Sequence, residues 1–423
     1  MLILFKVKNF TSFRNESILD MRATTYIQHP SHVIKINKKL DLLKATALYG
    51  ANASGKSNFI SAMFFFETYI FSQFINKNEY SDFDSCDTKA RSIIKLEPFL
   101  LTSEQNEFSE FEIIFTRNKK QYQYGFECSP SCVKSEWLYI DDALVFERTN
   151  GSVKFGTKYN NLIGDYKKVP TERLYIAVLD YFLEDSSKER VLSDFVAFFH
   201  KEFNVYTDIL LESTVKGLIG VYGLSEKLVS SVNFRKQVEH YLQQVDIGIK
   251  RLDIKTEVII NNETGEKKKE KIIKTVHDVY DDKGNIVGEK SFDLRQESTG
   301  TLRFIAYIQN IIDMISEGGV FIVDEMTARL HPLITKLVCD MFCSEQNKKA
   351  QLIFTTHDIS LLNNTQFRRD EIVFVDKNEH GESTLYSLSD LKVRDDATFS
   401  KDYLQGKYGA IPIIKYYDSL GGD

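Results

Sequence analysis

Residues 50–57 have the sequence GANASGKS, which matches the form G-x-x-x-x-G-K-S of a phosphate-binding loop. Residues 42–49 before it predict a buried strand, and residues 58–74 after it predict a helix packed against a sheet. Phosphate binding requires this strand–loop–helix order, because the glycines let the backbone wrap closely around the phosphates. The loop N–H groups and the helix N-terminus then face the negative charge. These flanks favour a phosphate site over a chance match in a glycine-containing loop.

Two side chains of this loop have defined roles in such a site. We expect Lys56 to reach the β- and γ-phosphates of a nucleotide and Ser57 to hold Mg²⁺. The sequence therefore predicts an α/β protein of the P-loop NTPase class. The residues of the loop that we expect to contact the nucleotide are Gly50, Asn52, Ser54, Gly55, Lys56, Ser57 and Asn58.

The composition is that of an ordinary globular protein. The chain has 423 residues, of which 43% are hydrophobic and 27% charged, enough for a large core and one to three domains. No apolar run approaches membrane-spanning length, and Lys6 and Lys8 interrupt the apolar start, so we expect a cytoplasmic protein with no membrane partner. The net charge of −6 does not indicate nucleic-acid binding, which is possible only through a local basic groove.

The five cysteines do not form a disulfide framework in a chain of this length. Two pairs, Cys128/Cys132 and Cys339/Cys343, share a C-x-x-x-C spacing that lacks the two-residue gap of zinc ribbons. We interpret them as buried structural cysteines. A run of three lysines at 267–269 is interpreted as a solvated hairpin tip.

Strand patterns surround the phosphate-binding loop. Residues 2–7 predict a strand with which residues 17–21 could pair in antiparallel fashion. Residues 108–115, 121–127 and 136–140 alternate as an antiparallel meander, which residues 144–148 and 153–155 could extend. No sustained heptad or internal repeat is present. We predict three parts: residues 1–179 as the N-terminal half of an ATPase domain, residues 180–290 as a mostly helical insertion ending in short strands, and residues 291–423 as the C-terminal half.

A second apolar strand, at residues 319–323, ends in two carboxylates. A buried parallel strand that delivers Asp-Glu at its C-terminal end is a Walker B motif. We expect Asp324 to orient the Mg²⁺ shell and Glu325 to polarise the attacking water. Two acids at a strand end can also cap a helix, but a phosphate-binding loop upstream favours the magnesium role.

Residues 351–358, QLIFTTHD, repeat the pattern of an apolar strand followed by polar residues. His357 is expected at the strand end, where an imidazole could sense the γ-phosphate. A single histidine is more often structural, but this position favours a functional role. The predicted catalytic residues are therefore Lys56, Glu325 and His357.

A second candidate anion site precedes the predicted helix 304–315. Here Ser298 and Gly300 form a Ser-x-Gly turn, and helix N-termini bind anions. One nucleotide does not need two such sites in one protomer. We therefore predict a homodimer in which each phosphate-binding loop is closed by Ser298 and Gly300 of the other chain. The alternative is that Ser298 is an ordinary helix cap.

The order of these motifs resembles the ABC-type ATPase head of structural-maintenance, Rad50 and RecF proteins. Outside residues 180–290, the chain is more closely similar to the bacterial AAA15 group, the RloA-like and overcoming-lysogenization-defect-like ATPases. The segments that carry this resemblance are Asn9-Phe10 in the opening strand, the blocks 111–115, 124–127 and 136–139, and the tail blocks 369–372, 385–390 and 408–412. The resemblance implies a mixed central sheet, an antiparallel β meander and a helical/β insertion.

The resemblance also implies a mechanism and partners. ATP and Mg²⁺ binding would close a homodimer, slow hydrolysis would open it, and the movement would control a separate nuclease or toxin effector encoded nearby, in defence against phage. A larger assembly is also possible. No Asp-x-Asp follows His357, so we expect no Toprim nuclease in this chain. The alternative is a RecF/Rad50-like DNA-binding ATPase of repair or recombination; a transporter energiser fits the meander and tail poorly.

Overall fold

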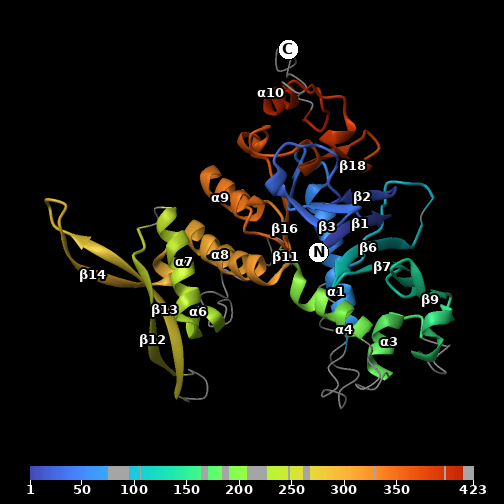
Figure 1. The fold of residues 1–423 in the computed structure, drawn as a ribbon, viewed down its shortest axis with the longest axis horizontal. Helices are drawn as coiled ribbons and strands as arrows, with labels where there is room; N and C mark the ends of the chain where they lie inside the picture. Colours follow the sequence, from blue (N-terminus) through green and yellow to red (C-terminus); the bar gives the residue numbers. More distant parts are fainter. Residues whose placement is uncertain are drawn as a thin grey trace, which may run out of the picture.

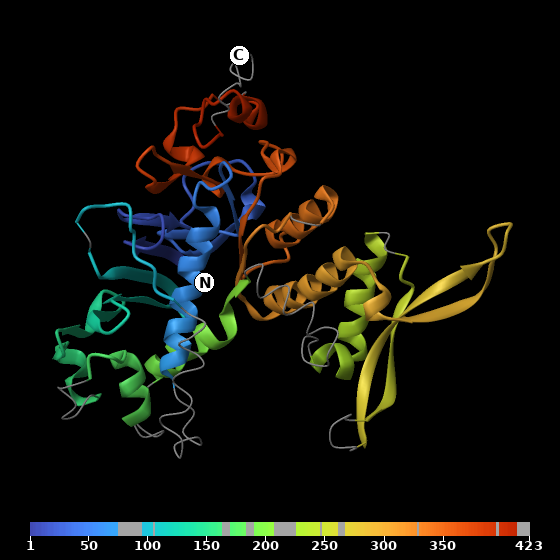
Figure 2. The same ribbon diagram turned by 180° about the vertical axis from the view of Figure 1, so that it is seen from behind.

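The computed structural model describes residues 1–74, 95–104, 106–162, 170–182, 190–206, 226–245, 248–260, 267–327, 330–394 and 397–412. Within these residues, two large sheets enclose helix α1 (Lys56–Gln73), and a smaller sheet projects from the rest of the chain (Figures 1 and 2). The predicted α/β class with a mixed central sheet and an antiparallel meander is confirmed.

The central sheet has six strands in the order β11-β15-β16-β5-β17-β18. The first five are parallel, and β18 pairs with β17 in antiparallel fashion. The carboxyl ends of parallel strands meet at one edge of a sheet, so the residues that follow them are brought together. The six strands are β11 (Phe203–Tyr206), β15 (Gly319–Val323), β16 (Ala350–Thr355), β5 (Ala45–Tyr49), β17 (Ile372–Lys377) and β18 (Ser383–Ser387).

The second large sheet is wholly antiparallel, in the order β10-β9-β8-β7-β6-β1-β2. It contains the predicted meander, and the expected pairing of the first two strands is present, with Leu4 opposite Asp20. Alternating apolar residues bury one face of this sheet. Its strands are β1 (Leu2–Lys8), β2 (Ser17–Asp20), β6 (Ser109–Arg117), β7 (Lys120–Cys128), β8 (Val133–Ile140), β9 (Ala143–Thr149) and β10 (Ser152–Phe155).

Helix α1 fills the space between the two large sheets. One core cluster joins its Phe66 to Phe111 of the antiparallel sheet and to Ile322 of the central sheet. The opposite face of the central sheet is covered by α8 (Thr299–Glu317) and α9 (Pro332–Cys343), which form a second cluster. The layers are therefore antiparallel sheet, α1, central sheet, and the α8/α9 pair.

The predicted strand at residues 42–49 is divided in the structure. Its first part is β4 (Leu40–Leu43), which pairs with β3 (Val33–Asn37) in a separate two-stranded sheet, and only β5 joins the central sheet. Lys44 stands at the break, and its buried ammonium donates a hydrogen bond to the Ser344 carbonyl at 2.7 Å. The sequence pattern of residues 42–49 did not reveal this change of sheet.

The predicted insertion divides similarly. Within it, β11 pairs with β15 and so belongs to the central sheet, after α4 (Arg190–Ala197) and one π-helical turn (Phe198–Glu202). The part beyond it contains α6 (Glu226–Ser230), α7 (Val232–Gln244) and a three-stranded sheet, which projects in Figures 1 and 2. That sheet, called the arm below, consists of β12 (Arg251–Ile260), β13 (Lys267–Tyr280) and β14 (Ile286–Asp293). The three-part division itself stays a prediction.

Three further sequence interpretations can be placed in the structure. Cys128, Cys339 and Cys343 are buried, as expected of structural cysteines, while Cys132 is half-buried. The lysine run at 267–269 opens β13, instead of forming a turn. Among the described residues, no helix combines the length and apolar character needed to cross a membrane. The remaining helices are α3 (Tyr175–Phe182) and α10 (Phe399–Leu404).

The α1 core makes a testable stability prediction. Phe66 is fully buried and stacks on Phe126 with ring centroids 5.2 Å apart. We expect Phe66→Ala to lower the free energy of unfolding by ~3–5 kcal/mol, because it removes ring contacts and leaves a cavity. Phe64, on the same helix, is only half-buried, so Phe64→Ala is a control that should lose less. Urea unfolding followed by circular dichroism measures both, and equal losses would contradict this account of the core.

Candidate nucleotide site

The phosphate-binding loop lies between β5 and α1, as predicted, and both of its outer glycines are required by their surroundings. A Cβ at Gly50 would lie 2.3 Å from the Val375 carbonyl oxygen. A Cβ at Gly55 would lie 2.4 Å from Ser383 Oγ, and Gly55 also has a φ of +112°. No larger residue fits either position without displacing its neighbours. The hairpin formed by β17 and β18 therefore packs directly against this loop.

Two serines outside the loop hold it in place. The Ser383 hydroxyl donates to the Ser54 carbonyl at 2.6 Å and lies 2.8 Å from Ser12 Oγ. Asn58 donates to the same Ser12 oxygen at 2.8 Å. Ser54 Oγ is buried and makes no hydrogen bond within the described residues, so it is available to a ligand. Sequence reasoning missed Ser12 and Ser383, because neither belongs to a recognisable motif.

Lys56 is only 5% exposed, and its ammonium donates to the carbonyls of Gly50 and Ala51, both at 2.9 Å. Burial lowers the pKa of Lys56 to about 8, while the carboxylates of Asp324 and Glu325 act in the opposite direction. The positive charge of Lys56 is therefore held inside the loop, among backbone carbonyls. It is also close to Asp324 and Glu325, which follow β15, two strands away from β5 in the central sheet. A lysine held in this way is suited to bind phosphate.

Thr355 connects the two acids at the end of β15. Its hydroxyl donates to Asp324 Oδ1 at 2.6 Å and accepts from the Glu325 N–H at 2.6 Å. Asp324 is buried, and Glu325 has a left-handed backbone with a φ of +47°. Such a conformation is costly for a non-glycine residue and is often found at functional sites. The sequence placed both acids at the strand end but did not single out Thr355.

His357 and Glu325 line one cavity with the phosphate-binding loop. The volume of this cavity is about 450 Å³. Partial burial and the nearby Lys56 charge lower the pKa of His357, so its imidazole is neutral at neutral pH. The lining residues are Asn52, Ala53, Ser54, Gly55, Lys56, Ser57, Asn58, Glu325, His357 and Lys377. Most of the predicted site residues are thus gathered at one edge of the central sheet, together with Lys377, which the sequence analysis did not identify.

Ser298 and Gly300 are not part of this cavity. Ser298 is exposed and caps α8, accepting from the Thr301 N–H at 3.1 Å. Helix α8 connects β14 of the arm to β15 of the central sheet, so its N-terminus lies beside the arm (Figure 2). Beside the cap, Glu297 accepts from Thr275 Oγ1 at 2.5 Å and contacts His277 Nε2 at 2.8 Å. The cap interpretation is therefore correct within one protomer, and the role across a dimer stays a prediction.

The residues present fit a Mg²⁺–nucleoside triphosphate. The loop forms a cradle that a Cβ would fill, Ser54 Oγ has an unused bond, and Lys56 supplies a buried cation. Ser57, in the first turn of α1, is exposed, and Asp324 is the acid that Thr355 orients. An oxygen pair of this kind, completed by phosphate oxygens and water, suits Mg²⁺.

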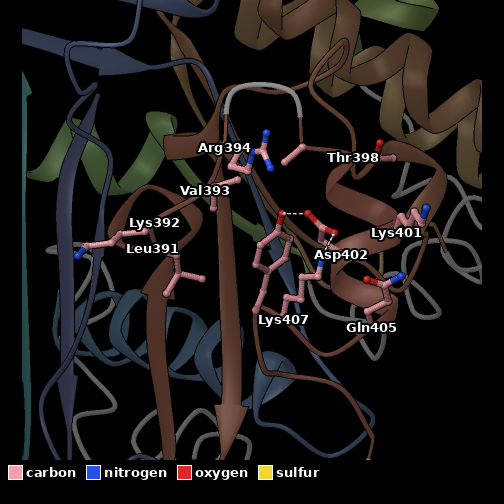
Figure 3. A pocket seen from close by; sticks show the side chains of 11 residues that line it. Leu391, Lys392, Val393, Arg394, Thr398, Lys401, Asp402, Gln405 and Lys407 are labelled. Atoms are coloured by element: carbon pink, nitrogen blue, oxygen red, sulfur yellow. Dashed lines mark hydrogen bonds and ion pairs between the residues drawn. The ribbon is translucent and has the colours of Figure 1, made fainter.

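A larger cavity of about 550 Å³ lies near the C-terminus (Figure 3). At its centre, Asp402 pairs with Lys407 at 2.5 Å and accepts from the Tyr408 hydroxyl at 3.3 Å. This cavity has no phosphate-binding loop, and its acid is already paired. The cavity beside the phosphate-binding loop is therefore the candidate site because of the residues that line it, although the C-terminal cavity is larger.

Fold and site together define a P-loop nucleotide-binding domain. A protein-family model described as "AAA domain, putative AbiEii toxin, Type IV TA system" matches residues 45–363, which include both nucleotide motifs and His357. The chain belongs to this AAA family. The narrower placement in the AAA15 group stays a prediction.

Solved structures of SMC heads are similar to this chain at low identity. An SMC head bound to the C-terminal winged-helix domain of ScpA has 13% identity and a TM-score of 0.44, covering 91% of this chain and 97% of that chain. The SMC head domain from Thermotoga maritima has 13% identity and a TM-score of 0.40, covering 93% and 99%. An SMC head from Pyrococcus furiosus, with an extended coiled coil and bound to the C-terminal domain of ScpA, has 12% identity and a TM-score of 0.38, covering 96% and 98%. No curated protein matches the chain.

The environment of Lys56 predicts how ATP binding depends on pH. Its pKa is lowered to about 8, so the ammonium loses its proton as the pH rises through 8, and its attraction for phosphate is lost. We expect ATP affinity to fall by up to ~10-fold between pH 8 and pH 9, with proton uptake on binding. Titration calorimetry in buffers of different ionisation enthalpy measures both quantities.

Lys56→Arg is the control for this pH dependence, because a guanidinium stays charged throughout this range. The variant should bind ATP more weakly, since the larger head group does not fit the same carbonyls, but its affinity should not change over this pH range. A wild-type affinity that is equally flat would contradict the lowered pKa of Lys56.

Proposed function

We propose that this protein is a Mg²⁺-dependent ATPase that dimerises on ATP and controls a separate effector protein. The observation that carries the proposal is the separation of two anion-binding elements. The phosphate-binding loop, Glu325 and His357 share one cavity, whereas Ser298 caps α8 outside it. A second copy, packed head to tail, would bring its own Ser298 and Gly300 to this cavity and complete it.

The residues of one chain would divide the work of hydrolysis. Mg²⁺–ATP supplies the γ-phosphoryl group and the charge that offsets its oxygens. Lys56 and the loop N–H groups bind the phosphates, while Ser57 and Asp324 hold the metal. Glu325 takes the role of general base toward water, in an orientation that Thr355 fixes through the Glu325 N–H. His357, as a neutral imidazole, can contact the γ-phosphate and sense its loss.

A protein effector fits the surface better than DNA does. Two lysines on or beside the arm are paired with acids: Lys250 with Asp278 at 2.7 Å and Lys274 with Glu257 at 2.7 Å. Paired charges release few counterions from nucleic acid. The matching family model, whose description names a toxin–antitoxin system, also favours a cytoplasmic protein that controls a toxin or nuclease, and we propose antiphage defence as the setting.

The experiment that tests the whole proposal uses Glu325→Gln. Loss of the general base should slow hydrolysis by ~10²–10⁴-fold while ATP still binds, so the closed dimer accumulates. We would express this variant with its native gene neighbours, purify it in Mg²⁺–ATP, and identify what accompanies it by mass spectrometry and nucleic-acid extraction. Lys56→Ala, which should not bind ATP tightly, is the control preparation.

A stoichiometric second protein, found with Glu325→Gln and reduced with Lys56→Ala, is the expected result. Nucleic acid without a protein partner would instead support a DNA-clamping ATPase of the RecF/Rad50 kind. Turnover equal to that of the wild type would show that Glu325 is not the general base.

The composite site makes a separate prediction about dimerisation. Gly300→Asp places a carboxylate at the exposed N-terminal turn of α8, where it would face the phosphates of the other protomer. We expect ATP binding by the monomer to be unchanged and ATP-dependent dimerisation to be lost, as measured by light scattering in a Glu325→Gln background. Asp313→Asn, near the other end of the same helix, is the control and should dimerise normally. Dimers of the Gly300→Asp protein would refute the head-to-tail arrangement.

A further inference from the structure

Strand β17 forms one wall of the nucleotide cavity. It lies next to β5 in the central sheet, with Phe374 opposite Tyr49, and continues past the point where β5 turns into the loop. Its Val375 carbonyl is the atom that excludes a side chain at Gly50. Its last residue, Lys377, is opposite Ser383 of β18, whose hydroxyl bonds the loop carbonyl of Ser54. The end of β17 is thus fixed directly against the phosphate-binding loop.

The Lys377 side chain faces the cavity. It lines the cavity together with the loop, Glu325 and His357. Side chains alternate along a strand, and the preceding residue, Asp376, lies on the other side, where its carboxylate would be 3.5 Å from a Cβ at Gly409. Lys377 is exposed, and within the described residues its ammonium makes no hydrogen bond or ion pair. The cavity therefore contains a second cation besides Lys56.

The two cations lie at different places relative to the acids. The strand order places β16 and β15, which His357 and Glu325 follow, on one side of β5, and β17 on the other. In a P-loop site the γ-phosphate points toward the acids that hold the metal and activate water. The nucleoside end of the bound molecule must then extend toward the opposite side, which is where Lys377 stands.

We propose that Lys377 binds the nucleotide at its α-phosphate, on the nucleoside side of the phosphate-binding loop. The inference rests on the proposed nucleotide site and deepens it. A lysine ammonium is a mobile point charge that only donates hydrogen bonds, so its target must be an anionic or acceptor oxygen. Because the α-phosphate is present in both ATP and ADP, Lys377 supports the binding of both and does not distinguish them. It is a binding residue that takes no part in proton transfer.

The test compares the binding of ADP and of the non-hydrolysable analogue AMP-PNP to Lys377→Ala. Both measurements use titration calorimetry with Mg²⁺ in the Gly300→Asp background, in which we expect the protein to stay monomeric. We expect Lys377→Ala to weaken both ligands by ~5–20-fold, because a charge-assisted hydrogen bond is lost, and to leave their ratio unchanged. The salt dependence of both affinities should decrease as well.

Two further variants keep this test specific. Lys377→Arg retains the charge and should recover most of the affinity for both ligands. Lys392→Ala removes an exposed lysine of the C-terminal cavity and should leave both affinities unchanged. Thermal unfolding without nucleotide shows whether each variant is folded, and we expect equal midpoints.

Three results would overturn the inference. The first is that both affinities are unchanged in Lys377→Ala. The second is a loss of affinity confined to AMP-PNP, which would place Lys377 at the γ-phosphate. The third is an equal loss in Lys392→Ala, which would indicate a general charge effect. Failure of the proposed function itself looks different. In that case the parent protein would bind neither ligand, or Lys56→Ala would bind both as tightly as the parent does.

Discussion

The burial of α1 on both sides is the constraint on which the nucleotide site depends. The helix packs against the antiparallel sheet through residues such as Phe66 and against the central sheet through the same core cluster. The position of α1 is therefore fixed in two directions. The N-terminus of the helix, which begins at Lys56, is fixed as a result. A helix on the surface of a single sheet could tilt, and the loop N–H groups would then lose their common direction. Two covering sheets exclude that movement, since packed cores resist small displacements.

The parallel register of the central sheet supplies the other half of the site. Val323 pairs with Phe354, and Thr355 pairs with Leu48, so three strands end at nearly the same level. Residues far apart in the chain then follow as neighbours: Lys56 after β5, Asp324 after β15 and His357 after β16. Thr355 adds a direct link, because one hydroxyl both donates to Asp324 and accepts from the Glu325 N–H. The acids are thus positioned by the adjacent strand as well as by their own.

Much of this arrangement could be predicted from the sequence, because its elements carry local patterns. The apolar runs before Gly50 and Asp324, the alternation of the meander and the motif residues all describe short segments. The features that could not be predicted from the sequence depend on contacts between segments far apart in the chain. Lys44 divides an apolar run because its ammonium reaches Ser344, and β11 joins the central sheet from within a helical region. Ser12, Ser383 and Lys377 reach the site only through pairing of β18 with β17 and packing on the loop. No local pattern marks such residues.

Helix α8 links the arm to the strand that precedes the two acids. Its last residues lead into β15, which Asp324 and Glu325 follow, while Ser298 caps its N-terminus beside the arm. Glu297 fixes this turn to β13 through Thr275 and His277. A displacement of β13 must therefore either break these bonds or move the N-terminus of α8. A 19-residue helix is stiff along its length. Such a movement would therefore change the position of Ser298 relative to the cavity of a second chain packed against it. The arm and the N-terminal turn of α8 thus form one mechanical unit, separate from the cavity that Glu325 lines.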